Sequence, residues 1–192
     1  MIGIPLGFLY ANATEWVAHR FVLHGWGKRK ESFWNFHWGE HHRHVRKNGH
    51  RDETYLKPLL SAWNPKSKET VALTFGVAAH LPLAPIAPFF VGTVAYSAIR
   101  YYRLHRRSHL DPEWAKEKLP WHYDHHMGKD QDANWCVTHP FFDIIMGTRK
   151  PYLGTAVERR DRMRKLQRSS RNASRKTAST STLNGSMMAS VT

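Results

Sequence analysis

Histidine is the residue type whose number and spacing in this sequence point to chemistry. The chain has 14 histidines among 192 residues, and ten of them fall into four short groups. The groups follow the patterns H-x4-H, H-x3-HH, H-x3-H and H-x2-HH along the chain. Their members are His19 and His24; His37, His41 and His42; His105 and His109; and His122, His125 and His126.

Helix geometry accounts for most of these spacings. Positions i and i+4 of an α-helix lie about 40° apart, so two such histidines present their rings on one face. The pairs predicted to do so are His37/His41, His105/His109 and His122/His126, with His42 and His125 beside them. The pair His19/His24 is different, because five positions correspond to about 140° on an ideal helix. These two rings could straddle two ions, or the helix could distort before Gly25.

Neutral imidazole is a ligand for Fe, Zn, Cu and Ni, so the groups predict a metal site. The single cysteine, Cys136, leaves no thiolate set and no disulfide framework. Ten imidazoles are too many for one ion and suit two. A site built from histidine alone stays strongly positive, which favours bound oxide or hydroxide and suits oxygen chemistry on reduced iron. The spacing itself does not distinguish iron from zinc.

The first two histidine groups require helices near the N-terminus. Ile2 to Val22 is mostly apolar and reads as a membrane-embedded or buried helix. Glu15, His19 and Arg20 near its end argue against a plain lipid-facing span, since polar groups at that depth are costly. A second helix is predicted to start near Ser32 and to fade at Asn48-Gly49.

The longest apolar stretch, Thr70 to Ile99, precedes the third group. Prolines at positions 82, 85 and 88 interrupt it, and proline breaks a helix interior. We therefore expect two short helices with a turn between them, as a hairpin that dips into a bilayer. Whether the hairpin crosses completely stays open. Two buried helices of a soluble bundle are the alternative. A basic, aromatic helix is predicted to follow and to end near Asp111-Pro112.

The charge is strongly positive, with 29 Lys and Arg against 15 Asp and Glu. This balance favours an anionic partner, either nucleic acid or an anionic membrane face. No nucleic-acid-binding motif is present, and anionic lipid accounts for a basic tail. The tail is rich in Arg, Ser and Thr, and we expect disorder beyond about Arg168. The predicted organisation is one domain over residues 1–155 and a tail over 156–192.

The histidine groups and their surroundings resemble the fatty acid hydroxylase superfamily of membrane di-iron enzymes. That superfamily includes sterol desaturases, fatty acyl hydroxylases and β-carotene hydroxylases. The resemblance covers roughly residues 8–150. The stretches that carry it are HRFVLHG (19–25), HWGEHHRH (37–44), HRRSH (105–109), HYDHH (122–126) and NWCVTHPFFDIIMGT (134–148).

The resemblance implies an all-α fold, with a helical membrane anchor of short hairpin arms and a histidine-rich cytosolic cap. The protein would then be integral to the membrane, with cap and tail on the cytosolic side, as basic loops favour. That membrane would be the endoplasmic reticulum of a eukaryote or the inner membrane of a bacterium. All ten grouped histidines would be metal ligands, and His37 is the one most affected if the register of the second group shifts.

The resemblance also implies an activity. Two iron ions, with zinc as a substitute, would use O2 and external electrons to hydroxylate or desaturate an unactivated C–H bond. The substrate would be a fatty acyl or sterol-type lipid, and a carotenoid β-ring is the alternative. The electron donor would be a separate protein of the cytochrome b5, ferredoxin or rubredoxin type. Rival functions of another class are a zinc-dependent lipid hydrolase and a non-enzymatic basic membrane-surface protein.

Residues outside the ligand set have expected roles as well. Glu40, Asp124 and Asp143 could accept the second ring N–H of ligand histidines, although each is as readily a helix-surface charge. His139 lies near the last group and is a candidate for the same role. We expect His44 and His50 to be solvated. His80 is expected to pack or to lie near a tunnel for an acyl chain.

Overall fold

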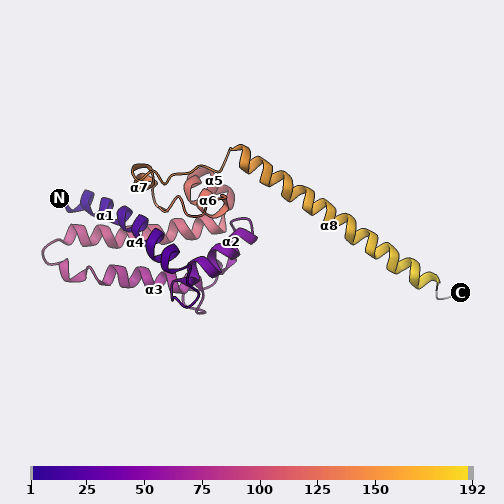
Figure 1. Ribbon diagram of the computed structural model, residues 1–192. Coiled ribbons are helices and arrows are strands. Elements are labelled where there is room, and N and C mark those ends of the chain that lie inside the picture. The colour runs from indigo at the N-terminus through magenta and orange to yellow at the C-terminus, as the bar shows by residue number, and fades with distance from the viewer. Residues whose placement is uncertain (1, 190–192) are drawn as a thin grey trace. The chain divides into compact units, whose positions relative to one another are not determined.

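A computed structural model describes residues 2–189 of the chain (Figure 1). The chain divides into two units, Met1–Leu153 and Gly154–Thr192, which are treated separately. The described residues form helices and connecting segments without any strand, so the predicted all-α fold is confirmed. The first unit contains α1 (Gly3–Val17), η1 (Ala18–Trp26), η2 (Phe36–His42), α2 (Arg43–Lys47), η3 (Glu53–Leu56), α3 (Pro65–Ala78), η4 (Leu81–Leu83), α4 (Pro88–Leu110), α5 (Pro112–Lys118), α6 (Pro120–Met127) and α7 (Phe141–Ile145).

Helix α4 is the central element of the first unit. Both α1 and α3 pack along it, as Figure 1 shows. Proline begins α3, α4, α5 and α6, where its missing N–H costs nothing and its fixed φ favours a helix. The Asn64 side chain accepts a hydrogen bond from the Ser67 amide and caps α3. The prolines and the Asn64 cap therefore set the positions at which these helices begin.

The predicted hairpin is present between α3 and α4. Helix α3 ends at Ala78, the short 3-10 helix η4 carries the turn, and α4 begins at Pro88. The prolines therefore separate two helices, as the sequence indicates. The second arm is longer than its apolar part, because α4 continues for 23 residues to Leu110 and carries the third histidine group.

The predicted integral membrane location is wrong, and the predicted membrane anchor has no support in the structure. Among residues 2–189, no helix has both the length and the apolar character needed to cross a bilayer. The turn limits α3 to 14 residues, and its first turn and a half are polar. In α4 the apolar residues give way to Arg100, Arg103 and Arg106 after Ile99. The apolar run is long in sequence, but the fold divides it.

The segment after α6 closes the first unit against α1. The Glu15 carboxylate accepts hydrogen bonds from the amides of Val137 and Thr138, at 3.0 and 2.9 Å. Trp16 packs in a small core with Trp135 and Cys136. The 135–138 segment is therefore fixed to the same helix that leads into the first histidine pair.

The second unit contains α8 (Ala156–Ala189), a single helix in the segment that composition predicts to be disordered. Its side chains up to Asn172 are mostly exposed, including Met163 and Leu166. The helix has local reasons to form, because Arg, Lys, Leu, Gln and Met favour helices and no proline interrupts the segment.

Candidate metal centre

Two π-helices position the first two pairs of the centre. In η1 and η2 the backbone is wound more widely than in an α-helix, so residues five positions apart come onto one side. His19 and His24 in η1 have ring centroids 5.1 Å apart, and His37 and His42 in η2 have centroids 4.8 Å apart. The helix therefore does distort at the H-x4-H pair. On an α-helix the two rings would lie about 140° apart, but the π winding of η1 brings them together.

The ring nitrogens gather into three groups whose ligand atoms lie within 4.8 Å of one another. The first histidine group contains His19, His24, His37, His42 and His125. The second contains His41, His105, His109 and His126, and the third contains His50, His109 and His122. All ten histidines predicted from spacing are present in these groups.

The winding also changes which histidines are partners. The prediction pairs His37 with His41, but the structure places them in different groups, and His42 joins His37 instead. In α6 the three histidines divide among the three groups, although their helix is a regular α-helix. Only His105 and His109 of the predicted i, i+4 pairs share a group, with their Nε2 atoms 3.1 Å apart.

Burial keeps the imidazoles neutral. Every grouped histidine is at most 3% exposed. Loss of solvation, followed by the influence of neighbouring histidines, places the pKa well below its ordinary value for eight rings: His19, His37, His42, His50, His109, His122, His125 and His126. The neutral ring is the form that binds a metal ion.

Backbone carbonyls fix which nitrogen of three rings faces inward. The Nδ1–H of His19 donates to the Trp135 carbonyl at 2.6 Å, and that of His125 donates to the Ala133 carbonyl at 2.7 Å. A carbonyl only accepts, so Nδ1 carries the proton and Nε2 keeps its lone pair. The His109 ring is oriented in the same way, at 2.9 Å from a carbonyl of the 48–52 loop.

The inward Nε2 atoms of the rings lie close to one another. In the first group the Nε2 atoms of His19 and His37 are 2.9 Å apart, and those of His125 and His42 are 3.1 Å apart. Two nitrogens held about 2.1 Å from one ion at a right angle are separated by about 3.0 Å. Buried nitrogens of His41 and His126 have no hydrogen-bond partner among the described residues. These donor sets fit a cation and are otherwise costly.

The four residues proposed to support the ligands occupy other positions. Glu40 is half-exposed and pairs with Lys68, and His139 is exposed. Asp124 is buried, where its carboxylate pairs with Arg149 and accepts from the Leu153 amide. Asp143 accepts from the amides of Trp135 and Cys136, both at 2.8 Å. Asp143 does not contact a grouped histidine, but it holds Trp135, whose carbonyl orients the His19 ring.

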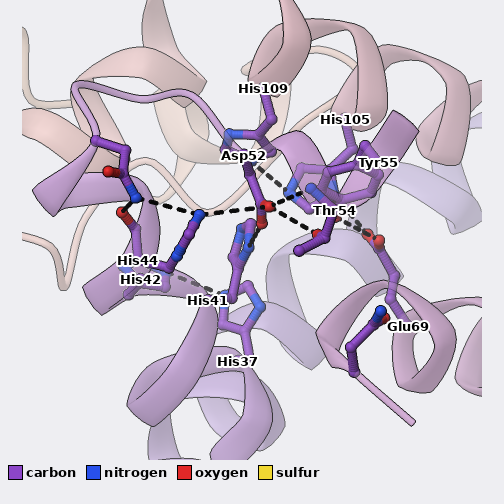
Figure 2. Close-up of polar contacts among 12 residues, drawn as sticks. His37, His41, His42, His44, Asp52, Thr54, Tyr55, Glu69, His105 and His109 are labelled. Atoms are coloured by element: carbon purple, nitrogen blue, oxygen red, sulfur yellow. Dashed lines mark hydrogen bonds and ion pairs between the residues drawn. The ribbon is translucent and has the colours of Figure 1, made fainter. Parts of the chain in front are cut away.

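Three other carboxylates contact the grouped histidines, and sequence reasoning missed them. Asp132 lies 3.2 Å from His24 Nδ1, Glu69 lies 2.5 Å from His105 Nδ1, and Asp52 lies 3.6 Å from His41 Nδ1. Figure 2 shows Asp52 beside His41 and Glu69 beside His105. Such carboxylates raise the basicity of a ligand ring and hold its orientation.

The charged state of Asp52 and of Asp132 is favoured in the fold. Burial on its own would raise the pKa of Asp52, but its contacts with His41 and Thr54 outweigh burial and hold that pKa below its ordinary value. The pKa of Asp132 is lowered first by the contact with His24, and its neighbour Lys28 adds to the effect. The first and the second histidine group therefore each have a carboxylate at their edge.

The remaining histidines separate into three cases. His44 is 48% exposed, which confirms its predicted solvation. His50 is fully buried, so its predicted solvation is wrong. The loop that carries it packs against α4, where the Asp52 amide donates to the His109 carbonyl. His80 lines a cavity, where its Nε2 lies 2.9 Å from the Tyr10 hydroxyl.

A cavity of about 370 Å³ adjoins the first histidine group. Helices α1, η1, α3 and α4 line it with mostly apolar side chains, among them Val22, Leu73 and Val94. His19 and His37 form part of its wall, together with the carboxylates of Glu15 and Glu69. Burial raises the pKa of Glu15 to about 7, against the opposing effect of its hydrogen bonds to Thr138 and Val137.

A comparison of the chain with protein-family models, curated proteins and solved structures gives no match.

Proposed function

We propose that the first unit is a non-haem di-iron oxygenase that hydroxylates or desaturates an unactivated C–H bond of a lipid. One observation carries this proposal: buried ring nitrogens gather in groups, and the first group adjoins a cavity lined mostly by apolar side chains. The motif resemblance to the fatty acid hydroxylase superfamily points the same way. The proposed substrates are fatty acyl or sterol-type lipids, and a carotenoid is the alternative.

The histidines would hold two ions. Five rings of the first group would bind one ion. The second and third groups share His109, whose single inward nitrogen serves one ion, so they would bind the other. Imidazole accepts both iron and zinc, and iron is proposed because bound iron supplies O2 activation and oxidation of C–H bonds. Zinc would occupy the same nitrogens without that redox chemistry.

The chain's own residues would bind the substrate and keep water out. Val22, Leu73 and Val94 offer an apolar wall that suits a hydrocarbon chain. His19 and His37 lie on the same wall, so a bound chain would pass beside the first ion site. A dry, enclosed site protects a strongly oxidising centre from side reactions. Electrons would come from a separate protein of the cytochrome b5, ferredoxin or rubredoxin type, since Cys136 is the only cysteine.

The test is lipid profiling of cells that express the wild type or one of three variants. His125→Ala removes a proposed ligand of the first group, whereas Ala72→Phe narrows the cavity and removes no histidine. Ala78→Phe is the matched control, because Ala78 lies on the same helix but lines a second cavity and not the first. We expect a lipid that gains an oxygen atom or a double bond in the wild type and in Ala78→Phe only.

Iron content separates the two causes of a lost product. After iron loading, the wild type and Ala72→Phe should hold about two ions per chain, and His125→Ala should hold fewer. A product that is unchanged in Ala72→Phe would place the substrate elsewhere. Wild-type protein with zinc, no iron and O2-independent release of fatty acid would instead establish a lipid hydrolase.

A further inference from the structure

His50 occupies an unusual place for a histidine outside the four sequence groups. Its side chain is fully buried, and neither ring nitrogen has a hydrogen-bond partner among the described residues. The ring centroid lies 4.6 Å from that of His109, 5.4 Å from His126 and 5.7 Å from His122. The third histidine group exists because His50 contributes a nitrogen to it.

The backbone at His50 is strained in order to put the ring there. Its φ is +80°, a left-handed conformation that residues other than glycine rarely adopt. The preceding Gly49 has φ of +66°, so the turn is prepared by a residue that adopts it freely. Strain of this kind persists only where the surroundings compensate for it, and it is concentrated at functional sites.

The same loop orients the neighbouring ring. The His50 carbonyl accepts the Nδ1–H of His109 at 2.9 Å, and the Asp52 amide donates to the His109 carbonyl at 2.9 Å. The His50 amide donates to the Val45 carbonyl at 2.8 Å and anchors the loop to α2. One residue therefore fixes the inward nitrogen of His109 and places its own ring beside the ring of His109.

We propose that His50 is an eleventh metal-binding histidine, which binds the same ion as His109 and His122. The inference rests on the proposed metal centre and adds a ligand that the sequence groups do not contain. Its His109 neighbour has one inward nitrogen, so the second and third groups describe a single ion site. The ion would engage an otherwise unpartnered nitrogen of His50 and compensate for its burial.

The competing explanation is that His50 only fills space. Its ring packs 4.8 Å from the ring of Tyr123, and an aromatic filler would serve there. His50→Phe separates the two roles, because phenylalanine keeps a ring of similar shape and removes both nitrogens. His44→Phe is the matched control, since His44 is an exposed histidine six positions earlier.

The experiment measures Co2+ binding to the full chain by competition with a chelator, and follows the visible spectrum of the bound ion. We expect wild type and His44→Phe to bind two Co2+ ions. In His50→Phe, the affinity of one site should fall by at least about 10-fold to 100-fold, the loss that removal of a mere supporting partner already causes. The metal-free His50→Phe protein should be no less stable to urea, because no unpartnered nitrogen is buried.

Each result decides the matter. Unchanged affinity and spectrum in His50→Phe would overturn the ligand role while leaving the metal centre intact. A wild type that binds no Co2+ would overturn the centre and His50 with it. If the phenylalanine variant does not fold, His50→Gly relaxes the backbone and removes the ring; added imidazole should then restore Co2+ affinity, and failure to restore it would contradict the proposal.

Discussion

Asp52 shows how a single residue serves both local structure and the centre. Its Oδ1 accepts from the Thr54 amide at 2.9 Å and caps η3, while Oδ2 faces His41 at 3.6 Å (Figure 2). The cap and the ring contact use different oxygens. A substitution that keeps the cap but removes the charge therefore isolates the effect on the histidine.

Asp52→Asn is such a substitution, because asparagine caps a helix as well as aspartate does. We expect metal affinity at the second group to fall about 10-fold to 100-fold, since the carboxylate no longer raises the basicity of His41. Affinity at the first group should not change. Chelator competition measures both, with Asp130→Asn as control, because Asp130 is an exposed residue that pairs with Lys150. Equal losses at the two groups would argue against a local effect.

Spacing in the sequence predicts the ligand type and brings together ten candidate residues, but it does not predict the carboxylates around them. Asp132 meets His24 and Glu69 meets His105 across separate elements. No periodicity links such pairs, because their contact depends on how the helices pack. The burial of His50 cannot be predicted from the sequence either, because it depends on a left-handed turn at Gly49 and His50 that composition does not specify.

At the scale of elements, helix existence is predictable and helix winding is not. The prolines at 82, 85 and 88 mark the hairpin, and the chain turns there. The apolar stretch around it suggests a hairpin that dips into a bilayer, but α3 begins with polar residues and the apolar part of α4 ends at Ile99. The π-wound η1 and η2 carry no local signal apart from the histidine spacing itself, which α-helical geometry misassigns for His37 and His41.

The segment 133–143 gives an element-scale prediction. Asp143 is buried and accepts from two backbone amides and from the Thr148 hydroxyl. Asp143→Asn places an amide donor opposite a backbone N–H, so the free energy of unfolding should fall by about 1–3 kcal/mol. Urea unfolding of the metal-free protein measures it. Asp111→Asn is the control, because it retains a cap on α5.

The metal affinity of Asp143→Asn should also change unevenly. The Trp135 carbonyl orients His19, so affinity at the first group should fall more than at the second. The reverse order, or no loss at either group, would show that the segment positions no ligand.

At the scale of the whole molecule, the buried histidines make the metal-free protein sensitive to acid. Burial lowers the pKa of eight rings well below 6.5, so in acid the unfolded chain binds protons that the folded chain does not. Stability is therefore present above pH 6.5 and is lost as pH falls below it. Each ring then contributes somewhat less than about 1 kcal/mol of destabilisation between pH 7 and pH 6, so that eight rings together contribute several kcal/mol.

That loss is comparable to the total stability of a typical domain. We expect the metal-free protein to unfold cooperatively near pH 6, and the metal-loaded protein to remain folded at that pH because the rings are occupied. Circular dichroism across a pH titration of both forms measures the difference. A metal-free protein that is stable at pH 5 would contradict the burial of neutral rings.

The second unit permits a further prediction. The described side chains of α8 are mostly exposed, and the grouped histidines all lie in the first unit. Removal of residues 156–192 should leave two metal ions per chain and the melting temperature of the metal-loaded form within a few degrees of wild type. Metal analysis and thermal unfolding test this. Loss of metal from a folded truncated chain would assign α8 a part in the centre.

The π winding of η1 and η2 has a consequence for insertions and deletions. Removal of one residue between His19 and His24 would leave the spacing H-x3-H, which α winding again places about 40° apart on one face. Deletion of the exposed Phe21 should therefore convert η1 to α winding and keep the two rings on one face. When other sequences are aligned with this one, a one-residue gap inside 19–24 that leaves H-x3-H would mark chains that carry this pair on an α-helix.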